Sequence, residues 1–133
     1  MSEIDLKEYS QFVDKVTSEE SKDSTAFRQR LDDLGNGDIP RLLTAAMGLS
    51  AESGEFTEIV KKLVFQGKPL TDDTRTHMIK ELGDVMWYWT QGCMALGIDP
   101  NKVIDMNKEK LLARYPEGEF EVAKSENRKE GDI

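Results

Sequence analysis

Residues 40–65 read PRLLTAAMGLSAESGEFTEIVKKLVF, and this stretch decides the fold. Its apolar residues recur at helical spacing, no proline interrupts it, and QGKP follows directly after it. Pro40 suits the first turn of a helix, and the glycine and proline of QGKP suit its end. The stretch therefore predicts one long helix whose core stripe contains Leu42, Ala45, Leu49, Phe56, Ile59 and Leu63.

The chain on the C-terminal side predicts two more helices. Residues 71–73 (TDD) offer N-cap oxygens for a second long helix that runs to about Leu96. The sequence GIDPN at 97–101 then supplies a C-cap glycine, an N-cap aspartate and a first-turn proline. A last helix is expected from there to near Tyr115.

The N-terminal part predicts weaker elements. Residues 3–17 place apolar side chains at three- and four-residue steps, and a short helix around Phe27 precedes the GNGD turn at 35–38. No segment alternates with period two. We therefore expect an all-α helical bundle with two long central antiparallel helices. We expect one domain over residues 1–120, with its core at about 40–116, and a flexible tail over 121–133.

Composition limits the classes of partner. The 26 acids and 18 bases leave a net charge of -8, which argues against a surface that binds nucleic acid or an anionic membrane. The single Cys93 has no internal disulfide partner, and no apolar run approaches the ~20 residues of a membrane span. The first residues, MSEIDLKEYS, lack the apolar stretch of a secretory leader. These features predict a cytoplasmic protein.

Each of the two long helices carries a pair of acidic residues on or beside its apolar stripe. Glu52 and Glu55 lie on or beside the apolar stripe of the first helix, and Glu81 and Asp84 have matching positions on the second. Four carboxylates on one seam repel each other, and a buried, uncompensated carboxylate costs several kcal/mol or becomes protonated. A set of carboxylates without clustered Cys or His favours Mg²⁺ or Mn²⁺, and such an ion suits phosphoryl chemistry. The alternative is a solvated helix surface.

At this point the chain resembles a known family. The segments GLSAESGEF (48–56), KELGDVMWYW (80–89) and NKEKLLARYPEG (107–118) are similar to the signature of MazG-type all-α nucleoside triphosphate pyrophosphohydrolases. These are relatives of the dimeric dUTPases and the dCTP pyrophosphatases. The match covers roughly residues 40–120. Ala51 departs from the pattern, because the family often has a second glutamate there, and this leaves the number of metal ions open.

The resemblance implies a reaction and a site. The reaction is hydrolysis of a nucleoside or deoxynucleoside triphosphate to the monophosphate and pyrophosphate. The catalytic residues and Mg²⁺ ligands would be Glu52, Glu55, Glu81 and Asp84, with Glu55, at the edge of the stripe, as the candidate general base. The alternative is a non-catalytic dimerisation or regulatory module that keeps the fold.

Further residues are candidates for substrate binding. Lys62 lies on the same helix edge as Glu55, and Tyr88 follows Asp84 by one turn. Each can meet a phosphate, or can simply pair with a glutamate or pack in the core. In the closing segment, the resemblance assigns a phosphate role to three residues on one helix face, for which an ordinary basic helix end is the alternative: Asn107, Lys110 and Arg114.

Three consecutive aromatic residues, Trp87, Tyr88 and Trp89, point three ways around the second long helix. A helix that is apolar on more than one side is usually buried on more than one side. We therefore expect oligomerisation to complete the bundle, as a homodimer or homotetramer, which the resemblance also implies. His77 stands alone in the sequence and is predicted to be a surface residue.

Overall fold

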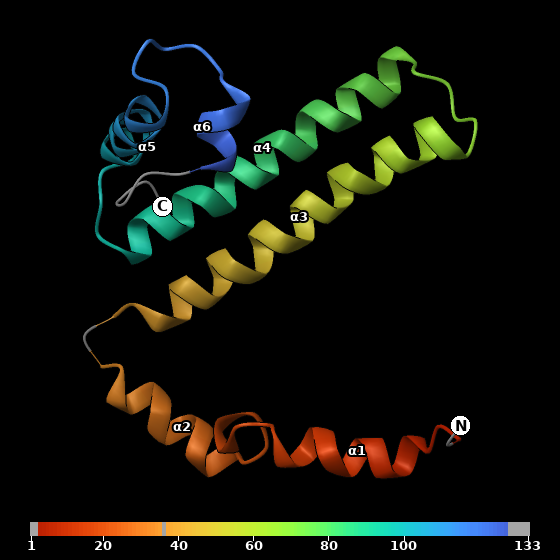
Figure 1. Ribbon diagram of the computed structural model, residues 1–133, viewed down its shortest axis with the longest axis vertical. Helices are drawn as coiled ribbons and strands as arrows, with labels where there is room; N and C mark the ends of the chain where they lie inside the picture. The colour runs from red at the N-terminus through yellow and green to blue at the C-terminus, as the bar shows by residue number, and fades with distance from the viewer. Residues whose placement is uncertain (1–2, 36, 128–133) are drawn as a thin grey trace. The chain divides into compact units, whose positions relative to one another are not determined.

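The computed structural model describes residues 3–35 and 37–127, and every regular element in these ranges is a helix (Figure 1). The all-α prediction is confirmed, and both long helices lie where the sequence predicted them. The elements are α1 (Leu6–Lys15), the 3-10 turn η1 (Glu19–Ser21), α2 (Ser24–Asp33), α3 (Ile39–Phe65), α4 (Asp72–Ala95), α5 (Pro100–Arg114) and α6 (Val122–Glu126).

The chain divides into two compact units, Met1–Ile39 and Pro40–Ile133. The expected single domain over residues 1–120 stays a prediction beside this division. The expected loose tail over 121–133 includes the short helix α6, where Lys124 Nζ lies 3.1 Å from a carboxylate oxygen of Glu117. Residues 128–133 of that tail lie outside the described residues.

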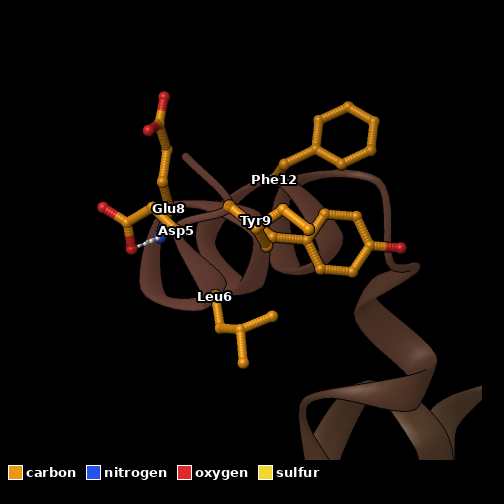
Figure 2. Close-up of a pocket in the computed structure, with 6 residues that line it drawn as sticks. Asp5, Leu6, Glu8, Tyr9 and Phe12 are labelled. Atoms are coloured by element: carbon orange, nitrogen blue, oxygen red, sulfur yellow. Dashed lines mark hydrogen bonds between the residues drawn. The ribbon is translucent and has the colours of Figure 1, made fainter. Parts of the chain in front are cut away.

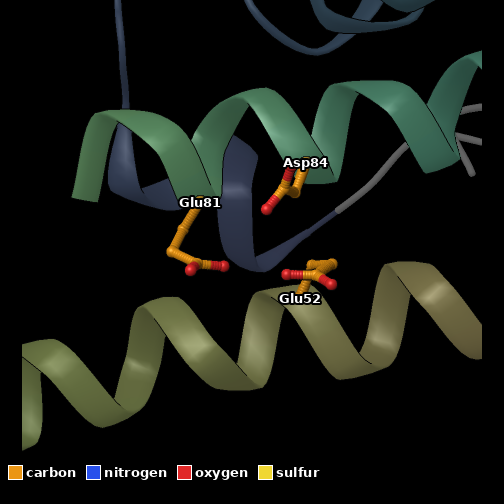
Figure 3. Close-up of side chains that lie close together, drawn as sticks. All are labelled: Glu52, Glu81 and Asp84. Atoms are coloured by element: carbon orange, nitrogen blue, oxygen red, sulfur yellow. The ribbon is translucent and has the colours of Figure 1, made fainter. Parts of the chain in front are cut away.

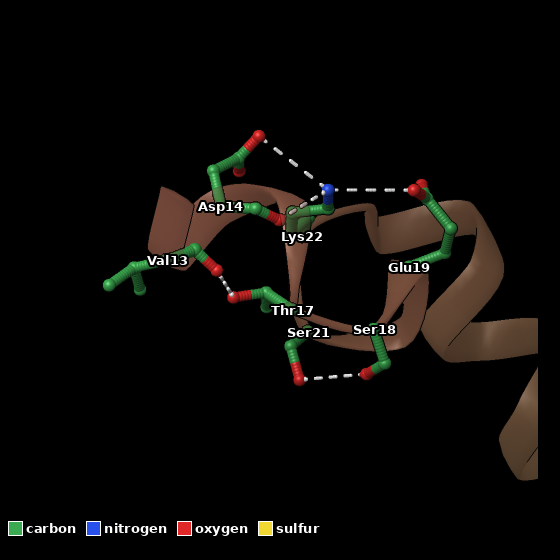
Figure 4. A network of polar contacts seen from close by, with 7 residues as sticks. All are labelled: Val13, Asp14, Thr17, Ser18, Glu19, Ser21 and Lys22. Carbon is green, nitrogen blue, oxygen red and sulfur yellow. Dashed lines mark hydrogen bonds and ion pairs between the residues drawn. The ribbon is translucent and has the colours of Figure 1, made fainter. Parts of the chain in front are cut away.

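Polar contacts hold the first unit together. The side chain of Asp5 accepts hydrogen bonds from the first-turn amides of α1. Lys22 Nζ donates to the carbonyl of Asp14 at 3.0 Å and lies 3.6 Å from carboxylate oxygens of both Asp14 and Glu19 (Figure 4). The lysine thereby ties the end of α1 to η1, and Asp23 caps the start of α2.

The apolar stripe of α1 remains exposed. Leu6, Tyr9 and Phe12 line a cavity of about 480 Å³ along this helix (Figure 2). Tyr9 and Phe12 keep 60% and 58% of their surface accessible. The predicted amphipathic helix therefore forms, but its stripe has little cover.

Helices α3 and α4 form the antiparallel hairpin of the second unit. Arg41 Nη1 donates to Gln91 Oε1 at 2.6 Å, and Gly48 of α3 faces the ring of Tyr88. Farther along, Glu52 meets the acids of α4. In these contacts, residues farther along α3 pair with residues earlier in α4. The two helices therefore run in opposite directions.

Local signals set the helix ends as predicted. Thr71 caps α4 by accepting a hydrogen bond from the amide of Thr74, and Asp99 caps α5 in the same way through Asn101. Gly97 turns the chain between these helices with φ of 63°, a conformation that favours glycine.

The second unit buries little apolar surface. In the described part of the chain, the buried apolar side chains are Ala45 and Cys93. Large side chains on α4 stay exposed, with Met86 at 54% and Trp87 at 56%. No helix in the described residues is both long enough and apolar enough to cross a membrane.

Candidate metal centre

Three carboxylates from two helices converge in the seam of the α3–α4 hairpin (Figure 3). Glu52 comes from α3, and Glu81 and Asp84 come from one face of α4, three residues apart. One carboxylate oxygen of each residue lies within 4.8 Å of the others. Glu52 and Glu81 are half-buried, whereas Asp84 is exposed. Three of the four acids predicted from the sequence are therefore neighbours in space.

The fourth acid, Glu55, lies one turn along α3 from Glu52 and is exposed. Among the described residues, the group with oxygens within 4.8 Å does not include it. Its negative charge nevertheless contributes to raising the pKa of Glu52. Ala51, just before Glu52, is also exposed. Direct ligation by Glu55 stays a prediction.

Charge repulsion acts most clearly on Glu52. Its pKa is raised above the ordinary 4.5, first because a shared hydrogen bond with Glu81 requires a proton, and second because burial disfavours the ionised form. The negative charges of Asp84, Glu81 and Glu55 raise the pKa further. The cluster therefore favours either a bound proton or a bound cation at this point of the seam.

The carboxylate of Glu81 has two different environments. Its Oε1 lies 3.1 Å from Nε2 of His77, one turn earlier on α4. Its Oε2 is buried and has no hydrogen-bond partner among the described residues. Glu52 can donate a hydrogen bond to Glu81 only when Glu52 itself carries a proton. A buried carboxylate oxygen without a donor, with two further carboxylates beside it, fits a site for a hard cation.

His77 is the residue at this site that the sequence did not single out. Its side chain is 57% exposed, as expected for a surface residue, while that of Glu81 is only 12% exposed. The available signal was the four-residue spacing, which places both side chains on one helix face. An imidazole that holds one oxygen of a carboxylate orients the other oxygen toward the seam.

Two predicted substrate-binding residues lie on the helices that carry the cluster, Lys62 on α3 and Tyr88 on α4. Lys62 is half-buried, and its Nζ lies 3.6 Å from Glu58, a glutamate whose pKa is lowered mainly by its hydrogen bond to Lys61. The ring of Tyr88 packs where a Cβ of residue 48 would stand, so this position of α3 requires glycine. Tyr88 thus has a packing role, and its predicted phosphate contact stays a prediction.

The three candidates on α5 have unequal environments. Asn107 is exposed and lines a cavity of about 470 Å³ together with Tyr115 and Phe120. Lys110 is half-buried. Arg114 is only 8% exposed, and its guanidinium carbon lies 5.8 Å from the ring centroid of Tyr115. Their common role in phosphate binding stays a prediction.

Comparison with known proteins finds a family model and a relative that are similar in sequence to this chain. Residues 41–118 match the family model of the MazG nucleotide pyrophosphohydrolase domain. The chain is also similar to the "Gene 37 protein" of Mycobacterium phage L5, with 36% identity over 88 residues that cover 63% of this chain and 77% of that protein. No solved structure matches the chain. The family match covers α4 and α5 completely and α3 from Arg41 onward.

Proposed function

Because the chain belongs to the MazG nucleotide pyrophosphohydrolase family, we propose that it hydrolyses nucleoside or deoxynucleoside triphosphates to the monophosphate and pyrophosphate, with Mg²⁺ as cofactor. The observation that carries this proposal is the meeting of Glu52, Glu81 and Asp84 across the hairpin seam, with one buried oxygen of Glu81 that lacks a donor. The cluster lies within the residues that match the family.

The donor set determines which ion fits. Glu52, Glu81 and Asp84 offer only oxygen ligands, which suit Mg²⁺ or Mn²⁺ better than a softer metal. When bound, such an ion neutralises charge on phosphate oxygens and makes a bound water more acidic. Glu55 would be a fourth ligand or would act through an outer contact.

The remaining residues have roles that follow from their charge and place. Glu55 is exposed beside the cluster and outside its closest group, so it is the carboxylate with a lone pair available to accept the proton of an attacking water. Attack of that water on the α-phosphorus forms the new P–O bond, and pyrophosphate leaves with the electron pair of the broken bond. Cationic and polar side chains would bind the phosphates, and we assign this role to Lys62, Tyr88, Asn107, Lys110 and Arg114.

Assembly is part of the proposal. The exposed apolar side chains on α4, including Leu82, Met86 and Trp87, leave more apolar surface in water than one helical hairpin can cover. A second copy of the chain would bury them and complete the bundle. We therefore propose a homodimer, or a homotetramer built from two such dimers.

A panel of nucleoside and deoxynucleoside triphosphates tests the activity through release of pyrophosphate with and without Mg²⁺. We expect turnover that requires the ion and that falls about 100-fold or more in Glu81→Gln, because this variant loses a ligand charge. Glu109→Gln, which changes an exposed acid of α5, is the matched control and should keep full activity. Failure to turn over any triphosphate, or equal rates for Glu81→Gln and wild type, would favour the non-catalytic module instead.

A further inference from the structure

A second cavity, of about 300 Å³, lies where α3 ends and α4 begins. Its lining includes nitrogen-bearing residues from three places in the chain: Lys62 from α3, Lys68 from the connecting loop and His77 from α4. Asp73 and Thr74, in the first turn of α4, also line the cavity. The three nitrogen-bearing side chains make the cavity a candidate site for a small anion.

The backbone at the end of α3 brings the two lysines to the same cavity. The chain turns at Gly67, whose φ of 67° favours glycine. This turn lets the amide of Lys68 donate to the carbonyl of Lys62 at 3.2 Å. Both side chains then line one wall although they are six residues apart. The end of α3 therefore places both lysines at one cavity.

The positive charges at the cavity favour an anion, because acidic residues of the protein do not fully neutralise them. Lys62 and Lys68 carry two positive charges, and Asp73 is the acid in the wall. Glu58 lies 3.6 Å from Lys62, but it is shared with Lys61, whose Nζ is closer at 3.1 Å. Among the residues that line the cavity, two lysines stand against one aspartate, in a chain of net charge -8. Ammonium groups bind phosphate as point charges.

The cavity adjoins the carboxylate cluster through His77. This residue lines the cavity and also contacts Glu81, with 3.1 Å between Nε2 and Oε1. His77 and Glu81 lie one turn of α4 apart, about 5.4 Å of helix, so a residue that lines the cavity also contacts the carboxylate cluster. A chain of linked phosphates that starts at the cluster can extend along this turn of α4 toward the cavity.

We propose that this cavity is the subsite for the pyrophosphate end of the substrate and for the inorganic pyrophosphate that is released, with Lys62, Lys68 and His77 as its anion-binding groups. The proposal rests on the proposed function, because it places the reacting phosphate at the carboxylate cluster. It assigns Lys68 and His77 a role in substrate binding, and it makes Asp73 an unfavourable neighbour of the anion.

Titration calorimetry with inorganic pyrophosphate and Mg²⁺ tests the subsite directly on the full chain. We expect Lys68→Gln to weaken the binding of pyrophosphate roughly 10-fold, the effect of one lost charged hydrogen bond. Lys102→Gln, an exposed lysine of α5 with the same change in net charge, should bind as wild type does. Asp73→Asn should bind more tightly. The KM for triphosphates should rise in Lys68→Gln, while affinity for the monophosphate stays constant.

The outcomes separate this inference from the proposed function. Wild-type turnover with unchanged pyrophosphate affinity in both Lys62→Gln and Lys68→Gln would overturn the subsite and leave the enzyme intact. Pyrophosphate binding that depends on the two lysines, in a chain that cleaves no triphosphate, would support an anion site and refute the function. Thermal melting should be equal for wild type and Lys68→Gln, because Lys68 is exposed.

Discussion

Replacement of Gly48 by alanine tests the seam that positions the carboxylates. A Cβ at this position would overlap three ring atoms of Tyr88, Cγ, Cδ1 and Cε1. Because Cγ is next to the backbone of α4, the ring has to rotate away or the helices have to separate. Overpacking of this kind costs about 1–3 kcal/mol, and the alanine gains about 1 kcal/mol of helix propensity. We expect a net loss of about 0–2 kcal/mol in the free energy of unfolding.

Gly54 provides the matched control on the same helix. Apart from the adjacent residues and backbone of α3 itself, no atom of the described residues lies within 4 Å of a Cβ built there, so Gly54→Ala should gain about 1 kcal/mol from propensity alone. Both variants gain the same helix propensity. The difference between their free energies of unfolding therefore measures the cost of the overlap with Tyr88, about 1–3 kcal/mol. Urea unfolding followed by circular dichroism, at one protein concentration, measures both. Equal stabilisation by Gly48→Ala and Gly54→Ala would refute the close approach of Tyr88.

Three further predictions concern charge, positioning and assembly. Because the pKa of Glu52 is raised in the folded protein, ionisation of Glu52 above pH 4.5 lowers the stability of the metal-free protein. The Tm of Glu52→Gln should therefore exceed that of wild type by a margin that grows with pH. A margin that is constant with pH would contradict this. His77→Ala should weaken Mn²⁺ binding to the substrate-free protein by about 10–100-fold, with partial recovery in His77→Gln, whose amide can donate; equal affinities would exclude a positioning role. Trp87→Glu should shift sedimentation toward the monomer, whereas a wild-type chain that already sediments as a monomer at micromolar concentration would argue against the assembly.

The fold could largely be predicted because its signals are local. Proline at the start of a helix, side-chain caps and glycine after the end each act within a few residues, and the helices begin and end where these residues stand. Helical periodicity then placed Glu52 beside Glu81 and Asp84 in the seam. These three depend only on the facing of two helices, which the apolar stripes determine.

The remaining features of the site depend on contacts between helices and loops, which helical periodicity does not predict. Periodicity does not predict the packing of Gly48 on Tyr88, nor that Glu55 lies outside the closest group of carboxylates. Arg114 is buried beside the chain that follows α5, where the tilted rings of Tyr115 and Phe120 have their centroids 5.6 Å apart. The cavity with Lys68 depends on the turn at Gly67, which sequence alone marks only as the end of a helix.

The carboxylates of the seam belong to two helices. Binding of a cation to them is therefore linked to the packing of α3 against α4. A cation held by Glu52 on one side and by Glu81 and Asp84 on the other would bind only while α3 and α4 stay closed. By mass action, a ligand that binds only the closed hairpin stabilises it, by about 2.7 kcal/mol at 100 times its dissociation constant. The same thermodynamic cycle requires that any partner or substitution that separates the helices lowers the affinity for the ion. Loss of the ion would therefore loosen the two helices that have to close before the ion can bind again.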